Sequence, residues 1–377
     1  MNKQFLIIKL LFIGILIFPA DSNGEQGFSK LPDREYWQDG KISKESLTLL
    51  IKNGKRATDT PVILGFYTKY YEDDEKSLNS LSNYYSYMNA VATATFEVNN
   101  MGEILGEIPT EGLALAKQHE VKRFATIQNG FDPDLAHTIL ASNEKSSMLI
   151  QELVKLTKEN GYTGVNVDFE KMNPSDRLLY TEFIANLSLS LEKEQIDLMI
   201  SVPAKTGDFP DNEWIGTFDY HELGKNADYI QLMTYDEHGT WGEPGPVAGV
   251  NWMTDVLDYA ATHIDSEKLL LGIPSYGYDW NLTLGADHKA VSQAEVENLL
   301  LEKNLAVQWD DPSQSPYVHY QDEQEQIHVI WFENNQSISE KVHLVKKYKL
   351  AGISMWRMGL EQESFWQSIE ETLEQFN

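Results

Sequence analysis

The sequence predicts an α/β protein built around a closed (β/α)8 TIM barrel. Three observations predict it: strand-like apolar segments alternate with helical patterns from residue 57 onward, the segments number eight, and several are apolar throughout. Alternation favours a parallel sheet, eight repeats favour closure, and unbroken apolar strands are typical of burial on both faces. An open, doubly wound sheet is the alternative architecture for the same pattern.

The eight expected strands are short runs rich in β-branched, aliphatic and aromatic residues. In chain order they are VILGFYT (62–68), AVATATF (90–96), RFATIQ (123–128), GVNVDFE (164–170), LMISVP (198–203), YIQLMTY (229–235), LLLGIP (269–274) and GISMW (352–356). The stretches between them carry the helices that return the chain to the next parallel strand.

Two of these helices are predicted from their spacing and end signals. Three leucines at helical intervals define a helix over 146–160, which Gly161 ends. A second helix is expected after Asn173 and Pro174, an N-cap residue followed by a first-turn proline.

The chain divides into four expected parts. Residues 1–24 place an apolar run after lysines and before small residues, which predicts a secretory signal peptide; an uncleaved membrane anchor is the alternative. Residues 25–56 are expected to form a lead-in segment. The barrel takes 57–279 and 337–377. Residues 280–336 are too many for a loop and combine a helical pattern with alternating segments, which predicts a small α+β insertion after the seventh strand.

The composition narrows the possible partners. The formal net charge is −28, which excludes nucleic acid as a partner because phosphate binding needs exposed Lys and Arg. The chain contains no cysteine, so its stability must come from the core and not from disulfides. Beyond the signal no apolar run approaches the ~20 residues of a membrane helix. We expect a secreted monomer without membrane attachment after signal cleavage.

Two carboxylates and an amide share one face of the fourth expected strand. Asn166, Asp168 and Glu170 lie two apart and so point to the same side, into the barrel. Their apolar neighbours point outward to the helices: Val165, Val167 and Phe169. Glu170 lies nearest the carboxyl end of the strands, where the active sites of such barrels are found. The structural alternative is an inward polar layer bonded to other strands.

Aromatic and polar residues also end other strands. Met233 and Tyr235 share one face of the sixth strand, Asp236 opens the loop after it, and Trp356 ends the eighth. An indole stacks on the apolar face of a sugar ring while carboxylates transfer protons, so these residues predict a sugar site. Core packing is the alternative role for the tryptophan. We assign Tyr67, near the end of the first strand, to the same cleft.

Three motifs in order resemble family 18 glycoside hydrolases. The run GVNVDFE is similar to the DGxDxDxE signature of that family, QLMTYD to its sixth-strand motif and GISMW to its eighth-strand tryptophan. The segments MTYDEHGTWGEPGPVAG and GIPSYGYDW resemble the branch that contains spore cortex-fragment lytic enzymes. The resemblance covers residues 60–377, including the insertion after the seventh strand.

The chain departs from the family pattern at two motifs. Thr163 and Asn166 stand where the signature has its first and second Asp, and the cortex-lytic branch resembles this chain in tolerating Asn. We expect Asn166 to hydrogen-bond Asp168 without holding a charge, and to lie within the substrate site. The sequence TIQNG replaces the third-strand SxGG motif of the family, which leaves substrate contacts there to Gln128 and Asn129.

The resemblance implies a retaining hydrolysis in which the 2-acetamido group of the substrate is the nucleophile. Glu170 would be the general acid and then the base for water, with a pKa raised by burial and nearby negative charge. Asp168 would hydrogen-bond the acetamido N–H, and Tyr235 would hold the acetamido carbonyl. Asp236 would contact the distorted sugar, and Trp356 would form the floor.

The resemblance favours an extracellular enzyme, in the cell wall or on spores, that cleaves β-1,4-linked N-acetylglucosamine in peptidoglycan or cortex fragments. A chitinase with the same residues is one alternative. A chitinase-like carbohydrate-binding protein is another, although such relatives typically lack the acid present here at Glu170. A structural sporulation or coat protein is the third. The nine histidines show no HExxH or similar spacing, so neither a catalytic metal nor a cofactor is expected.

Overall fold

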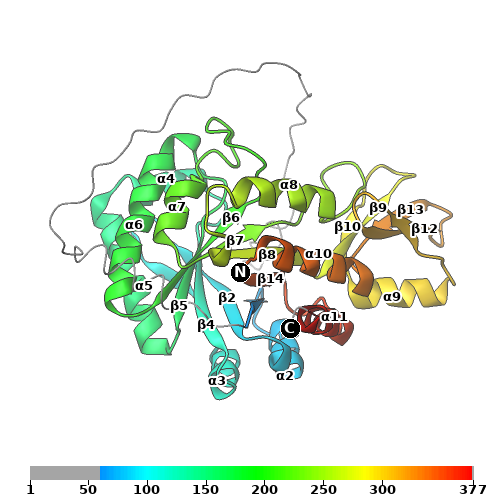
Figure 1. Ribbon diagram of the computed structural model, residues 1–377, viewed down its shortest axis with the longest axis horizontal. Helices are drawn as coiled ribbons and strands as arrows, with labels where there is room; N and C mark the ends of the chain where they lie inside the picture. The colour runs from blue at the N-terminus through cyan, green and yellow to red at the C-terminus, as the bar shows by residue number, and fades with distance from the viewer. Residues whose placement is uncertain (1–59, 376–377) are drawn as a thin grey trace, which may run out of the picture. The chain divides into compact units, whose positions relative to one another are not determined.

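The computed structural model describes residues 60–375, and within them eight parallel strands close into a barrel (Figure 1). The strands are β1 (Val62–Thr68), β2 (Ala90–Val98), β4 (Lys122–Gln128), β5 (Gly164–Asp168), β6 (Asp197–Pro203), β7 (Tyr229–Met233), β8 (Leu269–Pro274) and β14 (Gly352–Trp356). Closure is complete because β1 pairs with both β14 and β2. A short strand, β3 (Ile104–Gly106), extends the sheet antiparallel to β2. The predicted barrel is confirmed, strand by strand.

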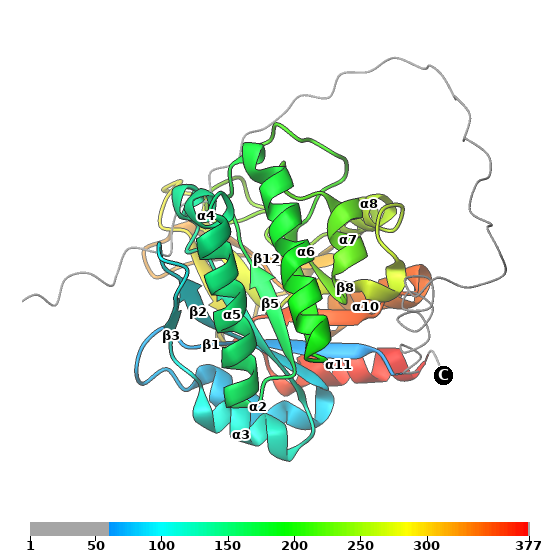
Figure 2. The ribbon, with the colours of Figure 1, turned by 90° about the vertical axis from the view of Figure 1, so that its left-hand side faces the viewer.

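Helices surround the barrel and connect its strands. They are α2 (Lys76–Tyr84), α3 (Thr110–Gln118), α4 (Pro133–Leu140), α5 (Asn143–Asn160), α6 (Arg177–Lys193), α7 (Tyr220–Asn226), α8 (Val250–Ala260), α10 (Asn335–Tyr348) and α11 (Glu363–Glu374). Within the described part of the chain three 3-10 turns lie among them: η1 (Tyr85–Tyr87), η2 (Pro174–Asp176) and η3 (Ser266–Lys268). Figure 2 shows α5 and α6 side by side in front of β5.

The two predicted helices differ in how well their ends were placed. Gly161 ends α5 in the left-handed conformation, with φ 71°, as the sequence indicated. The helix after Asn173 starts later than predicted, because Pro174 begins the 3-10 turn η2 and α6 follows it at Arg177. Asn173 is the N-cap of η2, with Pro174 in its first turn as predicted, but its side chain makes no capping hydrogen bond.

The alternation along β5 separates two cores. On the outer face Phe169, which follows the strand, stacks against Phe183 and Tyr180 of α6, with ring centroids 6.1 and 6.4 Å away. The inside of the barrel holds a separate apolar cluster of mostly large side chains: Leu64, Phe66, Ala90, Ala92, Phe124, Met199, Tyr229 and Leu270. The polar residues of β5 therefore point into the barrel, as the two-residue period predicted.

The insertion forms a second, antiparallel sheet with one helix, drawn at the right of Figure 1. Its elements are β9 (Tyr276–Asn281), β10 (Lys289–Ser292), α9 (Gln293–Glu302), β11 (Gln308–Asp310), β12 (Ser315–Gln321) and β13 (Ile327–Trp331). The sequence indicated α9 and the last three strands but neither β9 nor β10. Since β9 pairs with β13, the second sheet begins at Tyr276 and not at residue 280. The chain passes from the barrel into the second sheet directly after β8.

The predicted signal peptide (1–24) and lead-in segment (25–56) lie outside the described residues. Within residues 60–375 no helix combines the length and the apolar character that crossing a membrane requires.

Candidate active site

The deepest polar residue on the inner face of β5 is Asn166. It is fully buried, and its amide nitrogen donates to Thr126 Oγ1 of β4 at 3.3 Å and to Ser201 Oγ of β6 at 3.0 Å. These bonds link three neighbouring strands beneath the site. The expectations that Asn166 bonds Asp168 and contacts substrate were therefore wrong, because its amide is engaged within the barrel layer.

Asp168 ends β5 one step above Asn166 and is 5% exposed. Gln128 Nε2, at the end of β4, donates to Asp168 Oδ2 at 2.9 Å. The other oxygen, Oδ1, is buried and has no hydrogen-bond partner among the described residues. Burial raises the pKa of Asp168 to about 6, and the bond from Gln128 opposes that rise. Gln128 thus fixes the carboxyl group by one oxygen and leaves the other as an acceptor.

Glu170 lies just beyond the strand, and its backbone is held by one side chain. Asn129 Oδ1 accepts from the Glu170 N–H at 2.8 Å, while Asn129 Nδ2 donates to the Glu170 carbonyl at 2.9 Å. Asn129 is 1% exposed and also donates to the Asp132 carbonyl at 3.2 Å. The prediction that Asn129 contacts substrate is corrected: its amide continues the β4–β5 pairing past the end of the ladder and positions Glu170.

The carboxyl group of Glu170 is electrostatically set up to keep its proton. Burial raises its pKa well above the usual range, and the charges of Asp168 and Asp236 raise it further. The same three carboxylates raise the pKa of Tyr235, after the larger effect of burial. These four groups, predicted from separate segments of the sequence, are therefore brought together at the carboxyl ends of β5 and β7.

Tyr235 and Asp236, which follow β7, are held by residues of β7, β8 and β9. Gln231 Nε2 lies 3.5 Å from the Tyr235 hydroxyl, and the Tyr235 ring lies over Gly272 of β8, where a Cβ atom would come within 2.9 Å of it. Asp236 adopts a left-handed conformation, with φ 61°, and its Oδ1 accepts from the hydroxyls of Tyr276 at 2.6 Å and Tyr278 at 2.8 Å. This backbone conformation is uncommon for a non-glycine residue.

Trp356 ends β14 and borders two apolar clusters. Its ring meets Phe66, from inside the barrel, edge to face at 5.4 Å, and it packs against the cluster that includes Tyr276, Tyr278 and Trp280 of β9. The ring is half-buried, as is Met233 at the end of β7. Trp356 therefore packs between the apolar cluster inside the barrel and the aromatic side chains of β9 in the second sheet.

Tyr67 does not belong to this group. It lies on the outer face of β1, with its ring 2.9 Å from where a Cβ atom on Gly112 of α3 would stand. Burial, with the charges of Asp74, Glu111 and Glu75, raises its pKa to about 12. The prediction that Tyr67 binds substrate was wrong, because the register of β1 turns Phe66 inward and Tyr67 toward the helices.

Sequence reasoning missed four residues beside the site. Tyr276 and Tyr278 are separated from Asp236 by 40 residues or more, and only their two-residue spacing in YGYDW could have suggested a shared face. Tyr70 and Arg357 meet at the ends of β1 and β14, where the Arg357 guanidinium carbon lies 4.9 Å from the centre of the Tyr70 ring. No local pattern indicated that contact.

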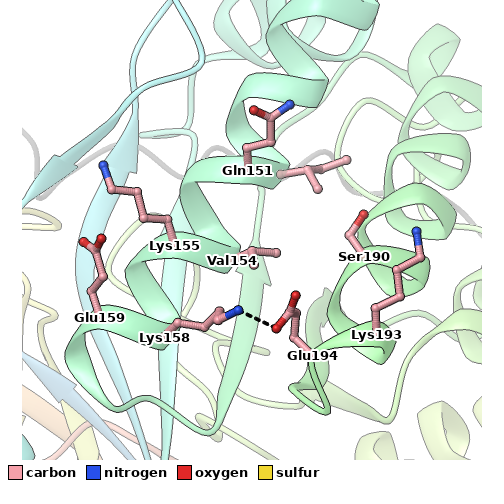
Figure 3. A pocket seen from close by; sticks show the side chains of 9 residues that line it. Gln151, Val154, Lys155, Lys158, Glu159, Ser190, Lys193 and Glu194 are labelled. Atoms are coloured by element: carbon pink, nitrogen blue, oxygen red, sulfur yellow. Dashed lines mark hydrogen bonds and ion pairs between the residues drawn. The ribbon is translucent and has the colours of Figure 1, made fainter.

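A groove elsewhere on the barrel lies far from this chemistry. It runs between α5 and α6, where Lys158 and Glu194 form an ion pair at 2.5 Å (Figure 3). These residues lie near the ends of helices that lead into β5 and β6, hence at the amino ends of the strands, opposite Glu170. Among the described residues no group of three or more His, Cys, Asp and Glu is arranged to hold a metal ion.

A barrel mouth with a proton-holding carboxyl group, a second fixed carboxylate, a phenol and a bordering indole defines the active site of a glycoside hydrolase. Comparison with known families agrees: residues 62–361 match the model for glycosyl hydrolases family 18, and the chain belongs to that family.

The proteins similar to this chain include a spore cortex-lytic enzyme and a chitinase. The chain is 39% identical over 325 residues to the glycosylase YvbX of Bacillus subtilis, covering 82% of this chain and 94% of that one. The spore cortex-lytic enzyme SleL of Bacillus megaterium has a TM-score of 0.78 at 28% identity, covering 83% of this chain and 74% of that one. A chitinase from Chromobacterium violaceum also has a TM-score of 0.78, at 29% identity, covering 83% and 99%.

Proposed function

We propose that this glycoside hydrolase is a secreted monomer that cleaves β-1,4-linked N-acetylglucosamine bonds in peptidoglycan or spore cortex fragments, with retention at the anomeric carbon. The observation that favours this mechanism is an acid of raised pKa, Glu170, beside a buried carboxylate whose Oδ1 lacks a partner, Asp168. Similarity to SleL supports the substrate class. The pattern of residues 1–24 supports secretion.

In the proposed first step the acetamido carbonyl oxygen of the substrate attacks its own anomeric carbon. The glycosidic C–O bond breaks, and Glu170 gives its proton to the leaving oxygen. Asp168 Oδ1 accepts a hydrogen bond from the acetamido N–H and stabilises the positive oxazolinium ring, while the Tyr235 hydroxyl donates to the acetamido oxygen. Asp168 is suited to this because Gln128 engages only its Oδ2.

In the second step water adds to the anomeric carbon from the face that the leaving group vacated. Glu170, now a carboxylate, takes the proton of that water, and the acetamido group is restored. Two inversions at one carbon give net retention. Asp236 stays fixed by its two tyrosine hydrogen bonds and lies where its charge helps to return the proton to Glu170.

Product analysis tests the proposal. Purified cortex, vegetative peptidoglycan and chitin oligomers would be incubated with the enzyme, and the products identified by mass spectrometry, with the anomeric form read by NMR at early times. We expect soluble fragments with N-acetylglucosamine at the new reducing end in the β form, and inhibition by an oxazoline-mimicking thiazoline.

Other results would replace the proposal. Cleavage of chitin oligomers alone would make the protein a chitinase. Binding without any product would make it a carbohydrate-binding protein. A fluorosugar that labels Asp236, with no inhibition by the thiazoline, would establish a covalent enzyme intermediate instead.

A further inference from the structure

Arg357 is a cation at the carboxyl end of the barrel, in the residue after Trp356. Its Nη1 donates to Thr68 Oγ1 at 3.1 Å, and its guanidinium lies over the Tyr70 ring at 4.9 Å. No carboxylate of the described residues lies within ion-pair distance of it. Arg177, by contrast, is paired at 2.8 Å with Asp208 and at 3.0 Å with a second aspartate. Arg123 also lacks a carboxylate partner, but its guanidinium donates to the carbonyls of Gly161 and Val121 at the amino ends of the strands.

The backbone of Arg357 is fixed on both sides, so the position of its side chain is defined. On one side, the Ser275 N–H donates to the Trp356 carbonyl at 2.9 Å; on the other, the Ser275 hydroxyl donates to the Arg357 carbonyl at 2.6 Å and the Met358 N–H donates to the Phe66 carbonyl of β1 at 3.0 Å. Between these anchors the guanidinium extends over the end of β1 to Tyr70. A stacked guanidinium keeps its remaining N–H donors in a fixed plane.

Arg357 lies at the same end of the barrel as the predicted catalytic residues, directly after β14. It follows Trp356, which borders the barrel mouth, and the Tyr70 ring beneath it is 48% exposed. Burial raises the pKa of Tyr70 and Arg357 lowers it, and the charge of Asp168 contributes a further rise. The Arg357–Tyr70 pair therefore lies at the carboxyl-end rim of the barrel, where β1 and β14 end.

The charges of the site give this pair a purpose. The carboxylates of Asp168 and Asp236 make the mouth of the barrel unfavourable for an anionic substrate, since like charges repel at short range. An uncharged glycan has no need of a cation there. A sugar that bears a carboxylate does, and the planar guanidinium fork matches a carboxylate with two parallel hydrogen bonds.

We propose that Arg357, stacked on Tyr70, binds a carboxylate substituent on a sugar of the substrate chain adjacent to the sugar being cleaved. The ligand class is an aminosugar glycan with a free 3-O-lactyl carboxylate, as in peptidoglycan from which the stem peptides have been removed, and the pair selects it over an uncharged chitin-type chain. The inference rests on the proposed hydrolase function and narrows its substrate.

Three soluble substrates of equal length test the proposal: an alternating glycan with free lactyl carboxylates, its methyl ester, and a chitin oligomer. We expect the wild-type enzyme to prefer the free carboxylate to the ester. Arg357→Gln should lower kcat/KM for the carboxylate glycan about 10- to 100-fold more than for the other two, mainly through KM. Arg357→Lys should recover part of that selectivity, because it keeps the charge and loses the fork. The matched control is Lys155→Gln, which removes a charge from the groove on the outer helical layer and should change none of the three rates.

Two results would overturn the proposal. One is an equal loss on all three substrates in Arg357→Gln, which would mean that Arg357 acts on the catalytic carboxylates or on the fold. The other is a wild-type enzyme that does not distinguish the carboxylate from its ester.

Binding separates this inference from the proposed hydrolysis. In the Glu170→Gln background, calorimetry should show tighter binding of the carboxylate glycan than of its ester, and Arg357→Gln should abolish the difference. If wild-type enzyme hydrolyses none of the glycans while this binding preference is present, the hydrolase proposal fails and the carboxylate site stands. If the preference is absent, the carboxylate site fails whatever the rates are.

Discussion

Two of the regions in which the protein buries carboxylates treat them differently. Glu333, which follows the second sheet, is buried together with Lys341 of α10, whose Nζ lies 2.7 Å from Glu333 Oε2. Asp168 is also buried, but its bound oxygen receives a neutral donor, Gln128, and no cation. In both groups the other oxygen has no partner among the described residues. Glu333 has a cationic counter-ion and Asp168 has none. This difference distinguishes a structural acid, Glu333, from a reactive one, Asp168.

The two regions differ in how they offset the free-energy cost of burying a carboxylate. A buried carboxylate beside an ammonium group is neutralised as a pair, so removing either partner is costly. A buried carboxylate without a cation can lower its energy by accepting hydrogen bonds or, where these are too few, by taking up a proton. The barrel mouth uses the second solution, and the raised pKa of Glu170 follows from it. Four substitutions test this contrast, from the largest expected effect to the smallest.

Glu170→Gln should abolish catalysis at the barrel mouth, the region whose buried carboxylates have no cation, without destabilising the fold. Loss of a positioned general acid costs about 10²- to 10⁴-fold in kcat, measured with a chromogenic chitobioside or a cortex glycan. Circular dichroism and the unfolding midpoint serve as the control for folding, and the midpoint should not fall, because the variant removes a buried acid. Undiminished turnover would remove Glu170 from the mechanism.

Lys341→Met should lower the stability of the fold, because it removes the cation of the buried Glu333–Lys341 ion pair. It leaves Glu333 buried without its cation, which costs about 3–5 kcal/mol in the free energy of unfolding measured with urea at pH 7. A second change, Glu333→Gln, should recover part of that loss, because no buried charge is then left. Equal stability of Lys341→Met and wild type would show that the pair is not the stabilising element proposed here.

Asn129→Ala should reduce kcat through the position of Glu170. The two hydrogen bonds to the Glu170 backbone are lost, and we expect about a 10- to 100-fold lower kcat with a smaller change in KM. Asn129→Asp keeps the acceptor for the Glu170 N–H and loses the donor to its carbonyl, so its kcat should lie between those of wild type and Asn129→Ala. A loss confined to KM would instead assign Asn129 to substrate binding.

Asp168→Asn should stabilise the fold in a pH-dependent way. The pKa of Asp168 rises from 3.8 to about 6 on folding, so the folded state binds the proton more tightly than the unfolded chain. The stability that this proton gives is present below about pH 4 and is lost as the pH rises through about 6. Above pH 7 the variant should therefore be more stable than wild type by about 1–3 kcal/mol, and the two should converge near pH 4. Urea unfolding at both pH values measures this, and a constant difference would contradict the shift.

The sequence by itself determined the barrel fold and which residues of the fourth predicted strand point into the barrel. Eight apolar runs require a sheet buried on both faces, and the two-residue period of GVNVDFE placed Asp168 and Glu170 inside. The motifs also placed Tyr235, Asp236 and Trp356 at strand ends, since a parallel barrel brings all carboxyl ends to one rim.

Only the tertiary structure decided which neighbours those residues have. Whether Tyr67 or Phe66 faces inward depends on the register of β1. Tyr276 reaches Asp236 because the chain changes sheet directly after β8, and Asn129 reaches Glu170 because β4 and β5 pair side by side. Such contacts join residues 40 or 41 positions apart, and local sequence carries no record of the strand pairing that brings them together.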